Sequence, residues 1–372
     1  MQEVEPFLNN KDLNYTNFNG QTGPCVYPAG FIYIYSILYK LTNFGKSIIT
    51  GQSIFAILYL LFISIIFKIY HQSKTVEPIF YLLVVLSSYR IHSIFMLRLF
   101  NDCFASLFNY SFILLLINDH FTLAAVFLSL GISVKMNGLL FLPSFILVSV
   151  YHKGIINTIN NLCAIISVQT ILASPFLFYD SKAYLVRAFE FSREFNFTWT
   201  VNWRFLGQDL FLNKTFHVGL LVCHLLFLII YSLIWVYQVK KSSISQLLVL
   251  GTPSKREVHM KHILWIVLLT NFTGIIFSRS LHYQFYIWYY HTIPMIFKFQ
   301  PYIPTVGKIG LILAIEYAWN VYPSTNLSSA VLLASHLVIF FFSIRSAFPK
   351  AKGVKTDSAP FKEKKSTKVV KN

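Results

Sequence analysis

The chain has 372 residues, of which 55% are hydrophobic, 17% aromatic and only 12% charged. A soluble domain carries about 25% charged residues, so this composition argues against a soluble enzyme, a disordered regulator or a nucleic-acid-binding module. The formal net charge of +17 is better explained by membrane topology or by phosphate-bearing ligands than by nucleic acid. Four cysteines lack the spacing of metal ligands or of a disulfide framework, and the sequence predicts no metal site and no bound cofactor. They are Cys25, Cys103, Cys163 and Cys223.

Apolar stretches follow one another from residue 48 to residue 346. A membrane-spanning helix needs about 20 mostly apolar residues, and several of these stretches are shorter than that. The eleven predicted spans are 48–70, 77–90, 103–118, 121–136, 138–152, 155–178, 216–240, 262–280, 285–298, 303–321 and 327–346. The sequence therefore predicts an all-α polytopic membrane protein with a transmembrane domain over 48–346.

A basic C-terminal tail, 347–372, indicates the orientation of the chain. It carries eight lysines against two acidic residues, Asp357 and Glu363, and basic residues beside the spans mark the cytosolic side. The loop at 240–261 is also basic and agrees with that assignment. An odd number of spans then places the segment 1–47 and the long loop 179–215 on the opposite side.

An aromatic run from Phe31 to Phe44 closes the N-terminal segment and follows the glycine- and proline-rich stretch 20–30. The run is too short to span a bilayer, and its tyrosines favour a membrane interface. We therefore predict a helix lying along the membrane surface within 1–47. The alternative is a shallow hairpin from a further pair of spans, which would upset the assignment of sides.

Basic residues also occur at span boundaries where the topology does not require them. Arginine pairs bidentately with phosphate oxygens, so we predict that the set binds the phosphate of a lipid-linked ligand. The predicted phosphate-binding residues are Arg90, Arg98, Lys135, Arg204 and Arg279. The alternative is that each cation snorkels or pairs with a nearby acid such as Glu190, Glu194 or Asp209.

Asp102 is the acid nearest to these cations at a span boundary. It follows Arg98 by four residues, which would put both side chains on one face of a helix. An ion pair that holds the loop is one interpretation. A role in catalysis is the other, since ionisable groups at membrane depth are functional candidates.

Two stretches combine aromatic and polar side chains in a way that suits binding of a sugar. Thr198–Leu206 interleaves Trp199 and Trp203 with Arg204, although tryptophan is also common at membrane interfaces. Ser278–Pro294 contains His282, Gln284 and His291, whose spacing does not match a compact metal site. We predict sugar-binding side chains at Tyr27, Trp199, Trp203, His282 and Gln284.

Taken together, these segments resemble the dolichyl-phosphate-mannose-dependent α-1,3-mannosyltransferases of the endoplasmic reticulum, a family of GT-C glycosyltransferases. The similarity covers nearly the whole chain in order. The segments that carry it are Thr22-Gly-Pro-Cys-Val-Tyr-Pro-Ala-Gly-Phe31, Tyr89–Asp102, Ser133–Asn137, Thr200–Leu206, Ser278–Pro294 and Trp319–Thr325.

The resemblance implies a GT-C-type bundle whose lumenal loops form the active site, in the endoplasmic reticulum membrane. It implies two partners, dolichyl-phosphate mannose as donor and Man(5)GlcNAc(2)-PP-dolichol as acceptor, and no nucleic acid. A β-linked donor that gives an α-linked product requires inversion at the anomeric carbon. A carboxylate would deprotonate the acceptor hydroxyl, while cations stabilise the departing phosphate. The segment 1–47 and the loop 179–215 would then be lumenal, and the tail 347–372 cytosolic.

The chain departs from the family pattern at its start. In the family, the stretch that corresponds to Met1–Glu5 follows a first transmembrane helix and an acidic Glu-Ile-Asp-Trp-type motif, where GT-C enzymes generally place the base. We therefore expect the sequence to be N-terminally incomplete. Among the nearest remaining acids, Glu3, Glu5 and Asp102, we take Asp102 as the candidate catalytic residue.

Two alternatives to an active mannosyltransferase stay open at this stage. A lipid or solute transporter is also polytopic and also carries charges at membrane depth, although the chain shows no internal symmetry. A catalytically impaired, truncated form that acts as a membrane scaffold is the other.

Overall fold

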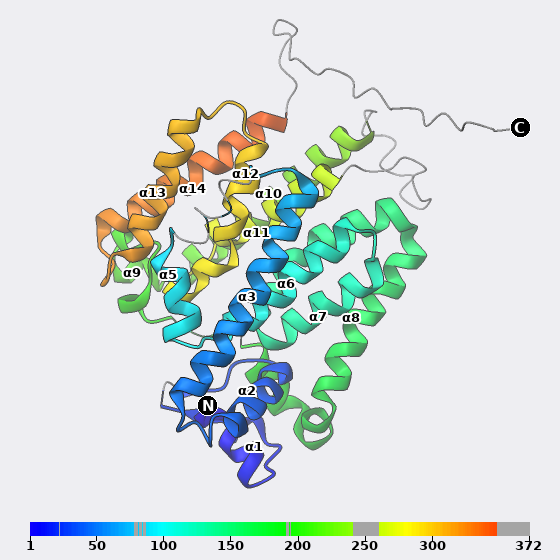
Figure 1. Cartoon of the computed structure of the whole chain (residues 1–372), viewed down its shortest axis with the longest axis vertical. Helices are drawn as coiled ribbons and strands as arrows, with labels where there is room; N and C mark the ends of the chain where they lie inside the picture. Colours follow the sequence, from blue (N-terminus) through cyan, green and yellow to red (C-terminus); the bar gives the residue numbers. More distant parts are fainter. Residues whose placement is uncertain are drawn as a thin grey trace, which may run out of the picture.

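Helices form nearly all the regular structure of the chain in the computed structural model (Figure 1). The structure describes residues 1–21, 23–77, 81, 84, 87–190, 193, 195–240 and 260–347. Nearly all of the predicted basic tail, most of the 240–261 loop and much of the predicted 77–90 span lie outside the described residues. Strands in the described part are limited to β1 (Asn19–Gly20) and β2 (Gly23–Pro24), which pair antiparallel with Gly20 opposite Gly23.

The longer helices carry the bundle, and shorter helices and turns connect them. The longer ones are α2 (Ala29–Leu41), α3 (Ile48–Ser73), α6 (Asp102–Ile117), α7 (Phe121–Val134), α8 (Leu142–Ala188), α10 (Lys214–Lys240), α11 (Met260–Ile276), α13 (Thr305–Asn320) and α14 (Asn326–Ala347). The short α-helices are α1 (Glu5–Asn9), α5 (Tyr89–His92), α9 (Gln208–Phe211) and α12 (Ile293–Lys298). The 3-10 turns are η1 (Gln2–Val4), η2 (Tyr15–Asn17), η4 (Met136–Phe141), η5 (Phe197–Trp199), η6 (Arg204–Leu206), η8 (Tyr283–Trp288) and η9 (Tyr290–Thr292), and η3 (Ser93–Leu97) is a π turn.

Four of the described helices are long and apolar enough to cross a membrane, or five if a bent pair is one span. They are Ile48–Ser73, Met136–Ala188, Lys214–Val239 and Asn326–Ser346, and the bent pair is Tyr89–Leu97 with Asp102–Ile117 at 114°. The prediction of an all-α polytopic membrane protein agrees with this architecture. The number of eleven spans is not reproduced, because several predicted stretches form helices shorter than a span.

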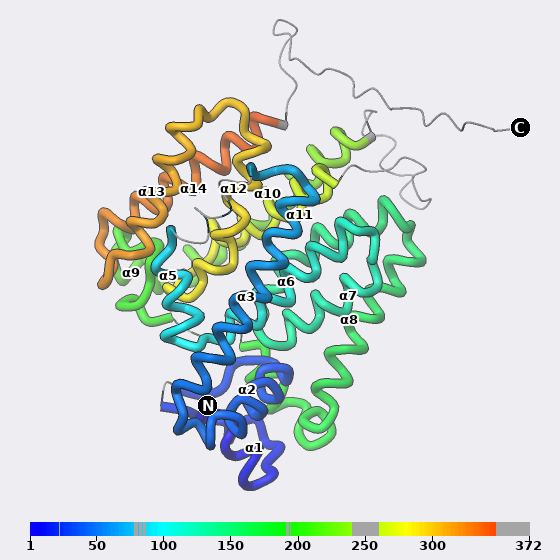
Figure 2. The backbone as a smooth tube through the Cα atoms, in the orientation of Figure 1, coloured from blue at the N-terminus to red at the C-terminus, as the bar shows by residue number. Residues whose placement is uncertain are grey.

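Two residues with non-helical backbone angles, Gly154 and Asp180, interrupt α8, and the break at Gly154 separates the stretches that the sequence predicts as 138–152 and 155–178. Gly154 has φ +80, a left-handed conformation that glycine adopts without a Cβ clash. Thr158 and Asn161 each donate a side-chain hydrogen bond to Ser149 Oγ across this break, at 3.0 and 3.3 Å. The parts of α8 before and after Gly154 therefore fold back against one another, and α8 is not one straight helix (Figure 2).

The predicted span 285–298 is wrong. The structure replaces it with η8, η9 and α12. Tyr289 leaves the helical region with φ −142, and Pro294 sits at the start of α12, where a proline ring is tolerated but cannot continue a preceding helix. Six residues of helix reach about 9 Å, far less than the bilayer core of about 30 Å. The aromatic residues of this stretch instead fill the core between the helices.

A helix, α2, forms in the segment where an interfacial helix was predicted, and it begins at Ala29, two residues before the predicted start. Its buried face, including Phe31, Ile32 and Tyr35, joins the main hydrophobic core. Gly30 lies so close to Ser133 that a Cβ there would be 2.9 Å from the Ser133 carbonyl oxygen. This close approach brings the N-terminal segment against the end of α7.

Candidate functional site

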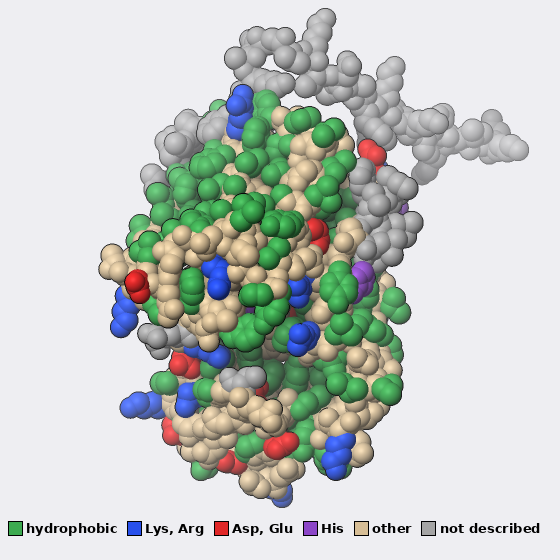
Figure 3. Space-filling view, turned by 90° about the vertical axis from the view of Figure 1, so that its left-hand side faces the viewer, with side chains coloured by type: hydrophobic (Ala, Val, Ile, Leu, Met, Phe, Trp, Pro, Cys, Tyr) green, Lys and Arg blue, Asp and Glu red, His purple; other side chains and the backbone are tan. Residues whose placement is uncertain are grey.

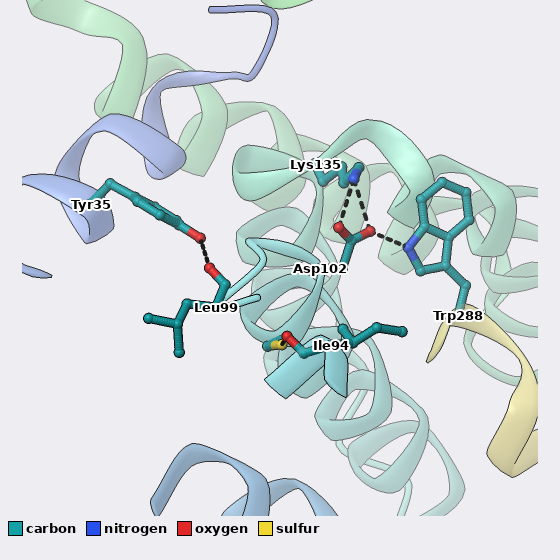
Figure 4. Close-up of polar contacts among 7 residues, drawn as sticks. Tyr35, Ile94, Leu99, Asp102, Lys135 and Trp288 are labelled. Atoms are coloured by element: carbon teal, nitrogen blue, oxygen red, sulfur yellow. Dashed lines mark hydrogen bonds and ion pairs between the residues drawn. The ribbon is translucent and has the colours of Figure 1, made fainter. Parts of the chain in front are cut away.

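A buried ion pair lies where α6 begins and α7 ends. Lys135 Nζ is 2.8 Å from both carboxylate oxygens of Asp102, and Trp288 Nε1 donates to Asp102 Oδ1 at 2.6 Å (Figure 4). Asp102 is 0% exposed and Lys135 8%. Three segments far apart in the sequence thus meet at one carboxylate, and the pair has no net charge.

Three aromatic rings surround the ammonium group of Lys135. Its Nζ lies 4.8 Å from the ring centroid of Phe285, 5.4 Å from that of Trp288 and 5.6 Å from that of Tyr27. Phe285 and Trp288 stack on each other at 4.0 Å with 17° between their planes. A cation over such ring faces is attracted by their quadrupoles. We call Tyr27, Phe285 and Trp288 the cage.

Local structure explains how these side chains meet. Asp102 is the first residue of α6, where the helix dipole favours a negative charge. Lys135 follows the last residue of α7 in an extended conformation, which directs the chain into η4. Tyr35 of α2 donates to the Leu99 carbonyl at 2.8 Å and so ties α2 to the bend before α6 (Figure 4).

The interpretation of Arg98 and Asp102 as a helical ion pair is wrong. Arg98 directly follows η3 and lies outside α6, and the chain turns by 114° between the two helical segments. The four-residue spacing therefore does not bring the two side chains together, and Lys135 takes the position of the partner. Arg98 is exposed and makes no ion pair with any described residue.

A line of aromatic and cationic groups leads away from the cage. The His282 ring centroid lies 5.4 Å from that of Phe285 and 5.3 Å from that of Phe195. The Arg279 guanidinium lies 5.3 Å from the centroid of the Phe195 ring. His282 Nε2 is buried without a hydrogen-bond partner. Burial, together with the positive charges of Lys135 and Arg193, lowers the pKa of His282 to about 4. A neutral ring nitrogen is thus available at this position at neutral pH.

Arg90 packs against the other side of η8. Its guanidinium lies 4.7 Å over the Tyr283 ring, and its Nε donates to the Trp319 carbonyl at 3.1 Å. Gln284, between the cage and this contact, is half-buried. Arg90 and Gln284 are therefore close to the cage in the fold, on the same turn or packed against it.

Two of the predicted residues in the long loop stabilise the loop itself. Trp203 is 8% exposed, packs with Phe211 and donates from Nε1 to the Ser278 carbonyl at 2.7 Å. Arg204 donates to the Phe197 carbonyl at 3.0 Å and lies over the Phe197 ring at 4.8 Å. The structure thus gives Trp203 no accessible face for a sugar. Trp199, in contrast, is 44% exposed.

Glu3 is a half-buried acid on the same side as the cage. Burial raises the pKa of its carboxyl group, and the charges of the Met1 amine and of Arg193 oppose that effect. Tyr27 lies within electrostatic reach of both Glu3 and Asp102, and burial raises the pKa of its phenol.

Lys and Arg side chains gather around a hollow on the face that carries α5 and α9 (Figure 3).

The sequence did not identify Phe285, Trp288 or Tyr283 as parts of the site. Phe285 and Trp288 lay in the predicted span 285–298, which hid their role, and Tyr283 lay just before it. In the described part of the chain, no three His, Cys, Asp or Glu side chains come close enough to hold a metal ion. The four cysteines are free, and Cys25 and Cys103 are buried.

Comparisons with known proteins agree over most of the chain. The family model described as ALG3 protein matches residues 1–329. A Dictyostelium discoideum protein named probable Dol-P-Man:Man(5)GlcNAc(2)-PP-Dol alpha-1,3-mannosyltransferase is 41% identical over 91% of this chain and 82% of its own length. A Homo sapiens protein named Dol-P-Man:Man(5)GlcNAc(2)-PP-Dol alpha-1,3-mannosyltransferase is 42% identical over 91% of this chain and 78% of its own length. The Mus musculus protein of that name is 39% identical over 94% of this chain and 81% of its own length. The chain therefore belongs to the ALG3 protein family.

Proposed function

We propose that this chain is a mannosyltransferase that moves mannose from dolichyl-phosphate mannose to Man(5)GlcNAc(2)-PP-dolichol in α-1,3 linkage. The observation that carries the proposal is the match over most of the chain to relatives that are named for this reaction. This match also favours an enzyme over a transporter. A site that combines cations, rings and acids fits two substrates that each carry a sugar and a phosphate.

We propose that the site faces the lumen of the endoplasmic reticulum. The start of α6, the end of α7 and η8 meet at one end of the bundle. The start of α14 lies at the same end, because Arg204 N donates to Ser329 Oγ at 2.9 Å and Ser324 Oγ donates to the Thr200 carbonyl. The last residues of α14 therefore lie at the opposite end, and the basic composition of the sequence that follows favours the cytosol there. The domain boundaries 1–47, 48–346 and 347–372 are part of this proposal.

The candidates for binding the phosphate groups whose charge is most available are Arg98, Arg90 and Arg279. Arg98 is exposed, and the other two are half-buried over aromatic rings. Lys135 and Arg204 were predicted for the same role. The charge of Lys135 is already compensated by Asp102, so it contributes a direct phosphate contact only if that pair opens.

In the proposed reaction, an acceptor hydroxyl oxygen attacks the anomeric carbon of mannose while the bond from that carbon to the phosphate oxygen breaks. A carboxylate takes the hydroxyl proton, and dolichyl phosphate leaves. Asp102 was predicted as this base, yet both of its oxygens bind Lys135 and one also accepts from Trp288. Glu3 is the alternative, because it is half-buried within electrostatic reach of Tyr27 of the cage, and burial raises the pKa of its carboxyl group.

Expression in a host that lacks its own enzyme tests the proposed function. We expect the lipid-linked oligosaccharide to be extended beyond Man(5)GlcNAc(2) by one mannose that an α-1,3-specific mannosidase removes. The human relative, expressed in the same host, is the positive control. If that control extends the precursor and this chain does not, the proposed function is wrong.

A further inference from the structure

Two aromatic side chains form an exposed pair beside the site. Trp199 of η5 and Tyr322, in the link between α13 and α14, have ring centroids 6.0 Å apart and planes only 20° from parallel. Trp199 is 44% exposed and Tyr322 is 59% exposed. We call these two rings the platform. Neighbouring apolar rings that stay open to solvent commonly mark a binding surface.

Contacts with neighbouring residues hold the platform in place. Tyr283 contacts Tyr322 edge-on at 5.5 Å and donates from its hydroxyl to the Val321 carbonyl at 2.9 Å. Ser324 Oγ donates to the Thr200 carbonyl at 2.6 Å, which ties the segment that carries Tyr322 to the segment that carries Trp199. The two rings therefore need little reorganisation to meet a ligand, and a preorganised surface binds with a smaller entropic cost.

One short turn connects the platform to the cage. Tyr283, which contacts Tyr322, is the first residue of η8, and Phe285 and Trp288 of the same turn contact Lys135. Arg90 lies over the Tyr283 ring, at the end of the turn that contacts the platform. A ligand whose reacting sugar lies near the cage can thus extend over the platform without leaving the protein surface.

The chemistry of the platform fits the face of a pyranose ring. The C–H groups on one face of a sugar form an apolar surface that stacks on an aromatic plane, while the hydroxyl groups at the edge stay hydrated. The donor carries a single sugar next to its phosphate, whereas the acceptor carries an oligosaccharide that must reach beyond the reacting centre. We propose that Trp199 and Tyr322 bind a sugar ring of the acceptor oligosaccharide, away from the reacting hydroxyl. This inference rests on the proposed function.

Kinetics with each substrate in turn test the proposal. We expect Trp199→Ala and Tyr322→Ala to raise KM for the Man(5)GlcNAc(2)-PP-lipid acceptor about tenfold, which corresponds to the loss of about 1.4 kcal/mol of binding. kcat and the donor KM should change less than twofold. Trp199→Phe and Tyr322→Phe, which keep a ring, should restore most of the acceptor affinity.

Tyr317→Ala is the matched control, because this tyrosine is 46% exposed on the neighbouring helix α13 and lies outside the platform. It should leave all three constants unchanged. An unchanged acceptor KM in both platform alanine variants would overturn the proposal. If those variants instead lose thermal stability in membranes but keep the acceptor KM, the two rings anchor the protein at the membrane interface.

A measurement without turnover separates this proposal from the proposed function. Free Man(5)GlcNAc(2) oligosaccharide, added to the purified chain, should change the tryptophan fluorescence of the unsubstituted protein and cause a smaller change in Trp199→Phe. Binding without mannose transfer would support the platform and contradict the proposed activity. Mannose transfer without any contribution of either ring to the acceptor KM would support the proposed activity and contradict the platform.

Discussion

Lys135 Nζ lies 2.8 Å from both carboxylate oxygens of Asp102, and the two residues are 33 positions apart in the sequence. The pair joins the end of α7 to the start of α6, and Trp288 ties η8 to the same carboxylate. One buried charge pair therefore fixes the relative positions of three segments that carry the site.

Removing one partner of this pair should destabilise the protein strongly. Asp102→Asn leaves the Lys135 ammonium buried without a counter-charge, and we expect a loss of about 3–5 kcal/mol of folding free energy. Thermal unfolding in detergent measures the effect. Asp102→Asn combined with Lys135→Met removes both charges and should recover much of the lost stability.

The same double variant distinguishes positioning from catalysis. If Asp102 only holds Lys135 in place, mannose transfer should partly return together with stability in the double variant. A double variant that is as stable as the unsubstituted chain but inactive would assign Asp102, or Lys135, a direct part in the reaction.

Gly30 should tolerate no larger residue. A Cβ at this position would lie 2.8 Å from Ser133 Cβ and 2.9 Å from the Ser133 carbonyl oxygen, so α2 would have to move away from α7. We expect Gly30→Ala to cost about 1–3 kcal/mol, as overpacked cores do, and to reduce transfer because Tyr27 shifts with α2. Thermal unfolding and the transfer assay together measure both effects.

Gly310→Ala is the control for that substitution, since no atom lies within 4 Å of a Cβ built there. Its Tm should stay the same or rise slightly, because alanine favours a helix over glycine. Equal losses of Tm in the two variants would contradict the close contact between Gly30 and Ser133.

His282 should make the protein less stable as the pH falls. Its pKa is about 4 in the folded chain, against an ordinary value of 6.5, so the unfolded chain binds more protons between these two values. The free energy of unfolding therefore rises with pH across this window. His282→Gln should flatten the dependence of Tm on pH between about 4 and 6.5, compared with the exposed His120→Gln as a control.

Arg98 and Arg204 should respond differently to truncation. Arg98 is exposed and unpaired among the described residues, so Arg98→Ala should raise the KM for a lipid-phosphate substrate and leave Tm unchanged. Arg204 holds its own loop through the Phe197 carbonyl, so Arg204→Ala should lower both Tm and transfer. Salt titrations check the first expectation, because contacts between exposed charges weaken as the ionic strength rises. Unchanged kinetics in Arg98→Ala would remove it from the phosphate site.

Composition and apolar patterning predict the class of the protein and most of its helices. Apolar runs at 48–70, 216–240 and 327–346 became α3, α10 and α14, because a long apolar segment satisfies its backbone in a membrane only as a helix. Predicting a span from the length of an apolar stretch alone failed at 285–298, where the aromatic residues fill the space between helices. Apolar composition cannot distinguish a segment that faces lipid from one that is buried in protein.

Which charged and aromatic residues work together depends on how the helices pack in three dimensions. Spacing along the chain paired Asp102 with Arg98, whereas the fold pairs it with Lys135 and Trp288. The bend before α6 breaks the helical periodicity on which the first pairing depends. The cage and the platform have the same origin: their side chains come from segments distant in sequence, and the packing of the helices sets the distances between them.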